Sequence, residues 1–391
     1  MDTNAVIALD NEYIMHTYGR LPLVPDHGAG ASLWDKDGKK YIDFTSGIGV
    51  NAFGYSDRGW VDAVYEQAIK YQHVCNYYYC EPAAVLAKWL VAKSGLSNVF
   101  FGNSGAEANE CAIKVARKYA AEQHGPDCFT ILTLKNSFHG RTLTTLAATG
   151  QEHYHELYQP LTPGFASVAT DLASLESMIH RTNPAGLLIE CIQGEGGVNV
   201  LDADFVRGAA QMVRDRGMVL MVDEVQTGNG RTGALYSYMN YGITPDVVTT
   251  AKGLGGGLPL GAALLGERVA NVLGYGDHGS TFGGNPVCCA GALSVLNRID
   301  DALLAEVREK GAFLTETFRG APGVRTVSGM GLMIGIEPVS AAADVVRCCM
   351  EHGVLCLTAK NKVRLLPALN IPWPVLREAA DVIRTACADL Q

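Results

Sequence analysis

The chain lacks the features that would place it in a membrane or on a nucleic acid. No run of about 18 apolar residues occurs, which argues against a transmembrane helix. The formal net charge is −9, so no basic excess favours nucleic acid or an anionic membrane as a partner. The N-terminus carries acidic residues early and lacks a basic segment followed by a long apolar core. We therefore expect no signal peptide.

Several short motifs are also missing. The 11 cysteines form no CxxC pair and no zinc-type spacing, so we expect reduced thiols, a cytoplasmic location and no metal site. The run GLGGGLPLG at 253–261 lacks the GxGxxG spacing of a dinucleotide-binding turn, and no Walker A sequence is present. The run GNSGA at 102–106 approaches the GxSxG sequence of hydrolases but ends in alanine. These absences disfavour nicotinamide, nucleotide and serine hydrolase chemistry.

What the sequence does contain is typical of a large α/β protein. Its 391 residues are 48% hydrophobic and 18% charged, which excludes a disordered chain. The 44 glycines cluster after apolar runs, where α/β enzymes place tight turns at strand ends. No repeat or low-complexity linker divides the chain. Short apolar runs alternate with amphipathic segments, and this alternation predicts an α/β fold with a largely parallel sheet.

The predicted elements also suggest how the chain is divided. A hairpin is predicted at 33–44 around Asp37-Gly38. Strands are predicted at 99–102, 129–134, 186–190, 218–224, 247–252 and 262–266, with helices at 60–71, 82–93 and 203–216 and a long helix after the first of these strands. From about residue 286 the pattern predicts a long helix, short strands at 331–336, 354–357 and 363–366, and a final helix at 375–390. We expect a large domain at 46–285 and a smaller α+β domain built from 1–45 and 286–391.

Three polar features follow predicted strands. Asn103-Ser104-Gly105-Ala106 precedes a helix, where free N–H groups suit a phosphate, although Ser104 and Glu107 equally match an ordinary capping box. Asp223 ends the strand MVLMVDE, at the sheet edge where α/β proteins bind ligands, or it caps a turn. Lys252 lies between an apolar strand and glycines, where desolvation would lower its pKa and favour a nucleophilic amine, or it extends to the surface.

Together the three features match the needs of one cofactor, pyridoxal 5′-phosphate. A helix N-terminus would hold the phosphate, Asp223 would keep the pyridine nitrogen protonated, and Lys252 would bind the cofactor covalently. Six ordered segments then extend the match along the chain: FFGNSGAEANECAIKVARKY (100–119), SFHGRT (137–142), IECIQGEGGV (189–198), DEVQTGNGRTG (223–233), AKGLGGGLPLGA (251–262) and HGSTFGGNP (278–286). In these segments the sequence resembles the class III aminotransferases of fold type I.

The resemblance implies both a fold and a cofactor site. The fold is a large cofactor-binding domain, with a mostly parallel seven-stranded sheet, and a smaller α+β domain. Lys252 and Asp223 match the catalytic residues, and Lys252 also matches the residue that shuttles the proton. The matching cofactor-binding positions are Ser104, Gly105, Ala106, Phe138, Asp223, Val225, Gln226, Lys252 and Thr281. In this family the residue at Thr281 reaches the phosphate of the neighbouring subunit, which implies a homodimer with the site at its interface.

The resemblance also implies how substrates bind. Arg141 and Arg364 match two carboxylate-binding arginines, which suits 2-oxoglutarate and glutamate because a guanidinium binds carboxylate through two hydrogen bonds. Glu195 matches an acid that pairs with an arginine while the amine donor is bound. Tyr18 and Ser280 match other substrate-side positions.

Within the family, the sequence is most similar to the members that act on N2-acetyl-L-ornithine and 2-oxoglutarate in arginine biosynthesis. Succinylornithine, succinyl-diaminopimelate, ornithine and 4-aminobutyrate stay open as alternative amine donors, as do racemase and mutase chemistry. A cofactor-binding protein without activity is disfavoured, because the catalytic positions are intact. The sequence departs from the family pattern at 54–58, at Cys191 and at Asn229, and none of these departures removes a catalytic group.

Overall fold

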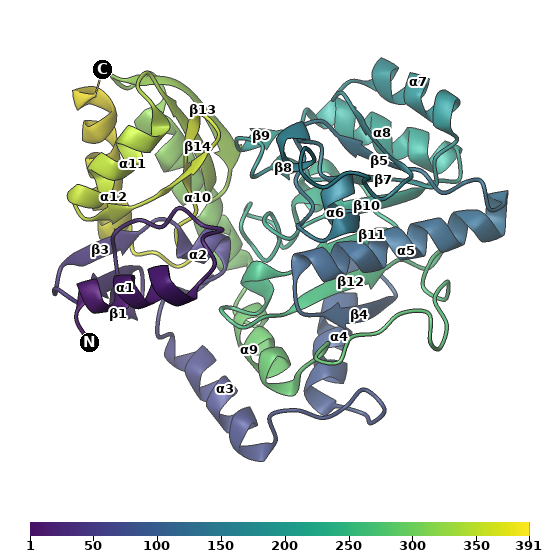
Figure 1. The fold of residues 1–391 in the computed structure, drawn as a ribbon, viewed down its shortest axis with the longest axis horizontal. Helices are drawn as coiled ribbons and strands as arrows, with labels where there is room; N and C mark the ends of the chain where they lie inside the picture. Colours follow the sequence, from purple (N-terminus) through teal and green to yellow (C-terminus); the bar gives the residue numbers. More distant parts are fainter. Residues whose placement is uncertain (391) are drawn as a thin grey trace.

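The computed structural model describes residues 1–390 and is built around a seven-stranded sheet (Figure 1). Strand β12 runs antiparallel to both of its neighbours, and the remaining neighbouring pairs are parallel. The predicted α/β class and the mostly parallel seven-stranded sheet are therefore confirmed. Across the sheet the strands are β4 (Asn98–Gly102), β12 (Gly261–Leu265), β11 (Val247–Thr250), β10 (Val219–Asp223), β7 (Gly186–Ile189), β5 (Ile131–Leu134) and β6 (Phe165–Val168).

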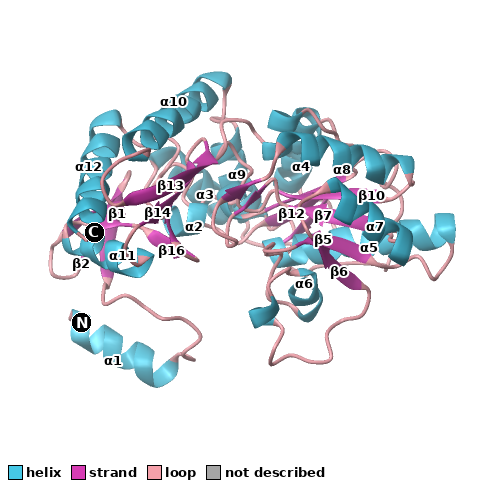
Figure 2. Cartoon of the chain, turned by 90° about the horizontal axis from the view of Figure 1, so that it is seen from above, coloured by secondary structure: helices cyan, strands magenta, loops and turns pink. Residues whose placement is uncertain are grey.

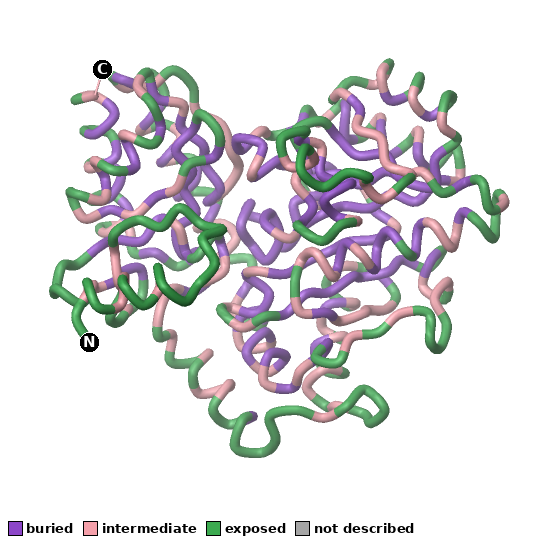
Figure 3. The backbone as a smooth tube through the Cα atoms, viewed as in Figure 1, coloured by how far each residue is buried: buried purple, intermediate pink, exposed green. Residues whose placement is uncertain are grey.

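Helices cover both faces of this sheet because its central strands are apolar on both sides (Figure 2). On β10, Val219 and Met221 pack in the cluster that contains the buried face of α5. The alternate residues Leu220 and Val222 pack in the larger cluster, together with α4, α7 and α8. These helices span Glu81–Ser94 (α4), Gly105–His124 (α5), Leu172–Thr182 (α7) and Ala203–Asp215 (α8), and the short α6 spans Leu143–Ala148. The central strands of the sheet are buried and its edge strands β4 and β6 are mostly half-buried, whereas the N-terminal segment is exposed (Figure 3).

Two smaller sheets form the other half of the molecule together with three long helices and the helices α1 (Thr3–Tyr13) and α2 (Ser46–Gly49) (Figure 1). The first sheet joins β1 (Pro25–Ala29), β2 (Ser32–Asp35), β3 (Lys40–Asp43) and β15 (Val354–Leu355). The second joins β13 (Val324–Met330), β14 (Met333–Pro338), β17 (Lys362–Leu365) and β16 (Leu357–Ala359). The three long helices are α10 (Asp301–Phe318), α11 (Ala342–Glu351) and α12 (Trp373–Asp389). Because β3 pairs with β15, the N-terminal and C-terminal segments share a sheet, and we propose the predicted two-domain division on that basis.

The remaining helices show where the sequence pattern was incomplete. The single long helix expected from residue 286 is wrong, because α9 (Pro286–Leu296) and α10 are separate helices. Helix α10 begins after Asp300, whose side chain accepts a hydrogen bond from the Leu303 amide at 2.8 Å and so caps the helix N-terminus. Helix α9 packs against α3 (Arg58–Lys70) and α4. No helix among residues 1–390 is both long and apolar enough to cross a bilayer.

Candidate active site

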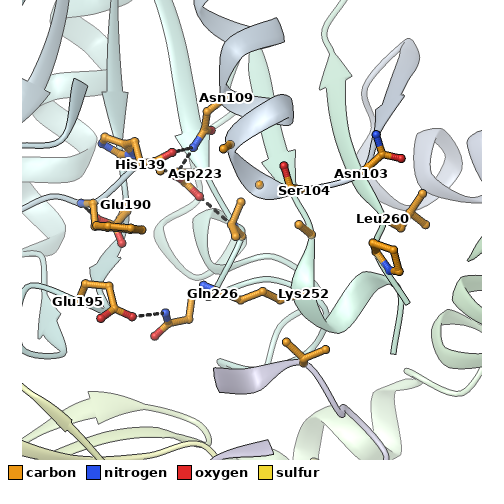
Figure 4. Close-up of a pocket in the computed structure, with 18 of the residues that line it drawn as sticks. Asn103, Ser104, Asn109, His139, Glu190, Glu195, Asp223, Gln226, Lys252 and Leu260 are labelled. Atoms are coloured by element: carbon orange, nitrogen blue, oxygen red, sulfur yellow. Dashed lines mark hydrogen bonds and ion pairs between the residues drawn. The ribbon is translucent and has the colours of Figure 1, made fainter. Parts of the chain in front are cut away.

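A cavity of about 420 Å³ lies at one edge of the seven-stranded sheet (Figure 4). Its walls come from the segments that follow β4, β5, β7, β10 and β11, so it occupies the carboxyl ends of strands that run in the same direction. This is the edge at which open α/β sheets bind ligands. Nine of the residues predicted from the sequence line the cavity: Ser104, Gly105, Ala106, Phe138, Glu195, Asp223, Val225, Gln226 and Lys252.

The N-terminus of α5 forms one wall of the cavity. Ser104 caps the helix by accepting a hydrogen bond from the Glu107 amide at 3.2 Å. The amides of Gly105 and Ala106 belong to the first helical turn and so have no acceptor within the helix. A Cβ at Gly105 would lie 2.6 Å from Val225 Cγ1, so glycine allows the helix to begin against the loop after β10. The cap and the phosphate-binding interpretation are therefore compatible.

Asp223 is held by three hydrogen bonds at the end of β10. Its Oδ2 accepts from Asn109 Nδ2 at 2.8 Å and from His139 Nδ1 at 2.9 Å, and its Oδ1 accepts from the Val225 amide at 3.0 Å. Asn109 is oriented in turn, since its Oδ1 accepts from Thr249 Oγ1 at 2.7 Å. The Asp223 residue is 4% exposed, so this carboxylate has a fixed position and one oxygen with spare capacity to accept another donor.

Glu190 is a second buried carboxyl group in the cavity wall. It accepts hydrogen bonds from the Phe138 amide at 2.8 Å and from the Gly194 amide at 3.3 Å. Burial, together with the nearby negative charge of Asp223, raises the pKa of Glu190 well above its usual value. Glu190 therefore joins the loop that carries Phe138 to the loop that leads to Glu195.

Lys252 follows β11 in a left-handed backbone conformation, with φ of 47°. The residue is half-buried because it borders the cavity. Burial lowers the pKa of its amine, an effect that the negative charges of Glu195 and Asp223 oppose. A lower pKa increases the neutral fraction of the amine, which is the form that acts as nucleophile and base.

Arg364, Glu195 and Gln226 form a connected group on another side of the cavity. Arg364 Nη1 donates to Glu195 Oε1 at 2.5 Å and to Gln226 Oε1 at 3.2 Å. Gln226 Nε2 also donates to Glu195 Oε1, at 3.3 Å. Burial alone would raise the pKa of Glu195, but its ion pair with Arg364 outweighs that effect and lowers it. Arg364 is 3% exposed, and the carboxylate of Glu195 balances its charge within the protein.

Five predicted residues lie outside the cavity lining of this chain: Arg364, which contacts the lining residues Glu195 and Gln226, and Ser280, Arg141, Thr281 and Tyr18. Ser280 is one contact away, since its Oγ accepts from Asn103 Nδ2 at 3.0 Å. Arg141 is exposed, and its guanidinium lies over the ring of Phe138 at 5.6 Å. Thr281 and Tyr18 are exposed, and neither is adjacent in sequence to a residue that lines the cavity. The roles of these five residues, like those of the nine that line the cavity, stay predictions.

Eleven lining residues were absent from the predicted set, and four of them are polar: Asn103, Asn109, His139 and Glu190. Glu190 had a usable signal, because it ends the apolar run GLLIE as Asp223 ends its own strand. Asn109 had a weaker signal, a polar residue beside the apolar face of the helix at 105–124.

The donors around the cavity fit pyridoxal 5′-phosphate. Free amides at the start of α5 suit the phosphate, the fixed carboxylate of Asp223 suits a protonated pyridine nitrogen, and the Lys252 amine suits covalent attachment. The family model for class III aminotransferases matches residues 13–387. The chain belongs to the class III aminotransferases, and it is a pyridoxal-phosphate-dependent enzyme.

Individual relatives agree with that family over the full chain. The sequence is 47% identical to the acetylornithine aminotransferase of Haemophilus ducreyi over 393 residues, covering 100% of both chains. Its structure is similar to the ornithine aminotransferase of Toxoplasma gondii ME49, with a TM-score of 0.95 and 30% identity over 100% of this chain and 96% of that one. It is also similar to the acetylornithine aminotransferase of Elizabethkingia anophelis, with a TM-score of 0.88 and 30% identity over 100% of each.

Proposed function

We propose that the enzyme transfers the ω-amino group of N2-acetyl-L-ornithine to 2-oxoglutarate. The products are N-acetyl-L-glutamate 5-semialdehyde and L-glutamate, and the reaction is a step of arginine biosynthesis. The observation that carries this substrate assignment is the 47% identity, over the whole chain, to a relative named acetylornithine aminotransferase. The ion pair between buried Arg364 and half-buried Glu195 beside the cavity supports a dicarboxylate as the second substrate.

In this proposal the cofactor supplies an electron-withdrawing ring, which stabilises negative charge on the reacting carbon of the substrate. The amides of Gly105 and Ala106, with Ser104, hold its phosphate, and Asp223 keeps a proton on its ring nitrogen. The Lys252 amine would take a proton from the substrate carbon that bears the amino group and deliver it to the cofactor carbon on the other side of the transferred nitrogen. Burial prepares Lys252 for this role by lowering its pKa. The remaining cofactor contacts come from Phe138, Val225, Gln226 and, from a neighbouring subunit, Thr281.

Arg364 and Glu195 allow one cavity to accept two kinds of substrate. While Glu195 neutralises Arg364, the cavity suits an amine donor that places no carboxylate there. When Glu195 turns away, the guanidinium is free to bind a carboxylate of 2-oxoglutarate through two hydrogen bonds. Arg141, next to Phe138, is proposed to bind the other carboxylate, with Tyr18 and Ser280 at the substrate end of the cavity.

The half-reactions test this proposal directly. N2-acetyl-L-ornithine alone should bleach the visible absorbance of the cofactor-loaded protein, and 2-oxoglutarate should then restore it. Ornithine is the first competitor to compare, because an ornithine aminotransferase has a very similar fold. If only ornithine, 4-aminobutyrate or a succinylated amine bleaches the protein, the proposed amine donor is wrong and the aminotransferase chemistry stands.

We also propose that the enzyme is a homodimer. Tyr77 and Tyr79 are fully exposed, and Phe282 is 59% exposed. Their loops lie together, since Asn76 Nδ2 donates to the carbonyl of Ser280 at 2.8 Å. A group of exposed aromatic residues is typical of a protein interface. Thr281 belongs to the same surface, where it could reach a partner's phosphate site.

Sedimentation of the purified protein should therefore give about twice the mass of one chain. Replacing Thr281 with alanine should preserve that mass and weaken cofactor binding. A monomer with full activity would contradict the dimer proposal.

The location proposed for the enzyme is the cytoplasm, which is supported by the free thiols of all 11 cysteines.

A further inference from the structure

Arg231 is a buried cation whose partners are carbonyl groups. The residue is 3% exposed, and it has no ion-pair partner within residues 1–390. Its Nη1 donates to the carbonyl of Leu332 at 3.1 Å and also to the carbonyl of Pro367. Burial lowers the pKa of Arg231 to about 10, so it still carries a positive charge at neutral pH. A buried charge held in this way needs all of its hydrogen bonds, which fixes the groups that accept them.

The two carbonyl groups flank β17, the strand that carries Arg364, and its neighbour β14. Leu332 immediately precedes β14, and Pro367 follows β17 by two residues. In the antiparallel pair, Gly335 on β14 lies opposite Arg364 on β17. Arg231 therefore binds the C-terminal end of the Arg364 strand and the N-terminal end of its neighbour. The backbones also meet here, since the Leu332 amide donates to the Arg231 carbonyl at 2.9 Å.

Space around this contact is tight. Gly331 has a φ of 56°, and a Cβ there would lie 2.6 Å from the carbonyl oxygen of Arg231. The loop after β10 and the turn before β14 therefore approach each other closely. Their backbones cannot move nearer to each other without a steric clash.

The loop that contains Arg231 is also tied to the cofactor side of the cavity. Asn229 is buried, and its Nδ2 donates to Thr250 Oγ1 at 3.0 Å and to the carbonyl of Ala251 at 3.2 Å, next to Lys252. Asp223 ends β10 just before this loop, and Gln226 lies within the loop, where its Oε1 accepts from Arg364 Nη1 at 3.2 Å. Arg231 thus joins the loop behind the cofactor groups to the sheet that presents Arg364.

We propose that Arg231 is a positioning residue for the dicarboxylate half of the reaction. It holds β14 and β17 against the loop after β10, and so sets where the Arg364 guanidinium stands relative to Gln226 and Glu195. This inference rests on the proposed role of Arg364 in binding a carboxylate of 2-oxoglutarate. Two-point binding of a carboxylate tolerates little displacement, because both hydrogen bonds must be aligned together.

Arg231→Met removes the hydrogen bonds and keeps a long side chain. We expect the KM for 2-oxoglutarate, and the Kd for glutarate, to rise about tenfold or more. Glutarate is an unreactive dicarboxylate whose binding to the loaded protein can be measured by calorimetry, so this readout does not depend on turnover. The KM for N2-acetyl-L-ornithine and the cofactor absorbance should change less than about twofold, because that half-reaction leaves Arg364 paired with Glu195. Arg231→Lys keeps the charge but not the planar fork, and should give an intermediate glutarate Kd.

Arg298→Met is the matched control. Arg298 is half-buried and pairs with Asp57 at 2.8 Å, away from β14 and β17, so its loss should lower the melting temperature without a selective effect on dicarboxylates. Equal changes in both KM values for Arg231→Met, or the same selectivity in Arg298→Met, would overturn the inference. If Arg231→Met does not fold, an unchanged glutarate Kd in Arg231→Lys would overturn it. If the wild-type enzyme neither binds glutarate nor responds to 2-oxoglutarate, the proposed function itself fails.

Discussion

Lys252→Ala should lower turnover by about 10⁴-fold or more, because it removes both the covalent attachment point and the base. The structure offers no replacement, since Lys252 is the only lysine among the described residues that line the cavity. Borohydride treatment of the loaded protein, followed by mass spectrometry, should show a cofactor adduct at Lys252 in the wild type and none in the variant. Single-turnover mixing with N2-acetyl-L-ornithine measures the loss of rate.

Lys310→Ala is the control for the loss of a lysine side chain that lies outside the cavity. Lys310 is fully buried and pairs with Glu306 at 2.9 Å on α10, and it does not line the cavity. That variant should be less stable and should still carry the cofactor adduct. Retention of wild-type rates in Lys252→Ala would remove the basis of the proposed mechanism.

The position of the cavity could be predicted because parallel strands all end at the same edge of the sheet, where α/β proteins bind ligands. Asp223 and Lys252 each end an apolar run, and runs that form parallel strands place their ends at one edge. The α5 N-terminus was predictable in the same way, since Ser104 follows a short apolar strand. Local patterns therefore identified the three features that imply the cofactor.

Local patterns could not identify residues whose neighbours depend on the order of the strands in a sheet. Glu190 lies near Asp223 because β7 pairs with β10, although the two residues are 33 positions apart. Arg364 reaches Glu195 through the register of a separate sheet, so only the family resemblance suggested it. Helix α1 (Thr3–Tyr13) was missed because it buries no residue and therefore shows little apolar periodicity. Tyr18 and Thr281 are exposed in the described chain, and the family resemblance alone suggested a role for them.

Asp223→Asn should lower the rate of the half-reaction by about 10²–10⁴-fold, through the loss of one charge at a fixed position. The carboxylate is an acceptor at both oxygens, taking hydrogen bonds from Asn109 and His139 at Oδ2 and from the Val225 amide at Oδ1. An amide presents a donor on one side, so in either orientation its NH₂ group faces a protein donor. The ring nitrogen then loses the negative charge that keeps it protonated, and the cofactor should also bind more weakly. Stopped-flow absorbance after adding N2-acetyl-L-ornithine measures the rate, and titration of the cofactor-free protein measures the affinity.

The neighbouring Glu224 separates this electrostatic effect from the cost of altering a buried acid. Glu224 is fully buried and accepts hydrogen bonds from Ser237 Oγ and Thr227 Oγ1, both at 2.6 Å, and it does not line the cavity. Burial raises the pKa of Glu224. Replacing Glu224 with glutamine alters a buried acid outside the cavity, so it should reduce stability while leaving the half-reaction close to wild type. Equal losses of rate in Asp223→Asn and Glu224→Gln would mean that packing, rather than the charge at Asp223, accounts for the effect. A selective loss in Asp223→Asn would assign the effect to the negative charge of the Asp223 carboxylate in the cavity wall.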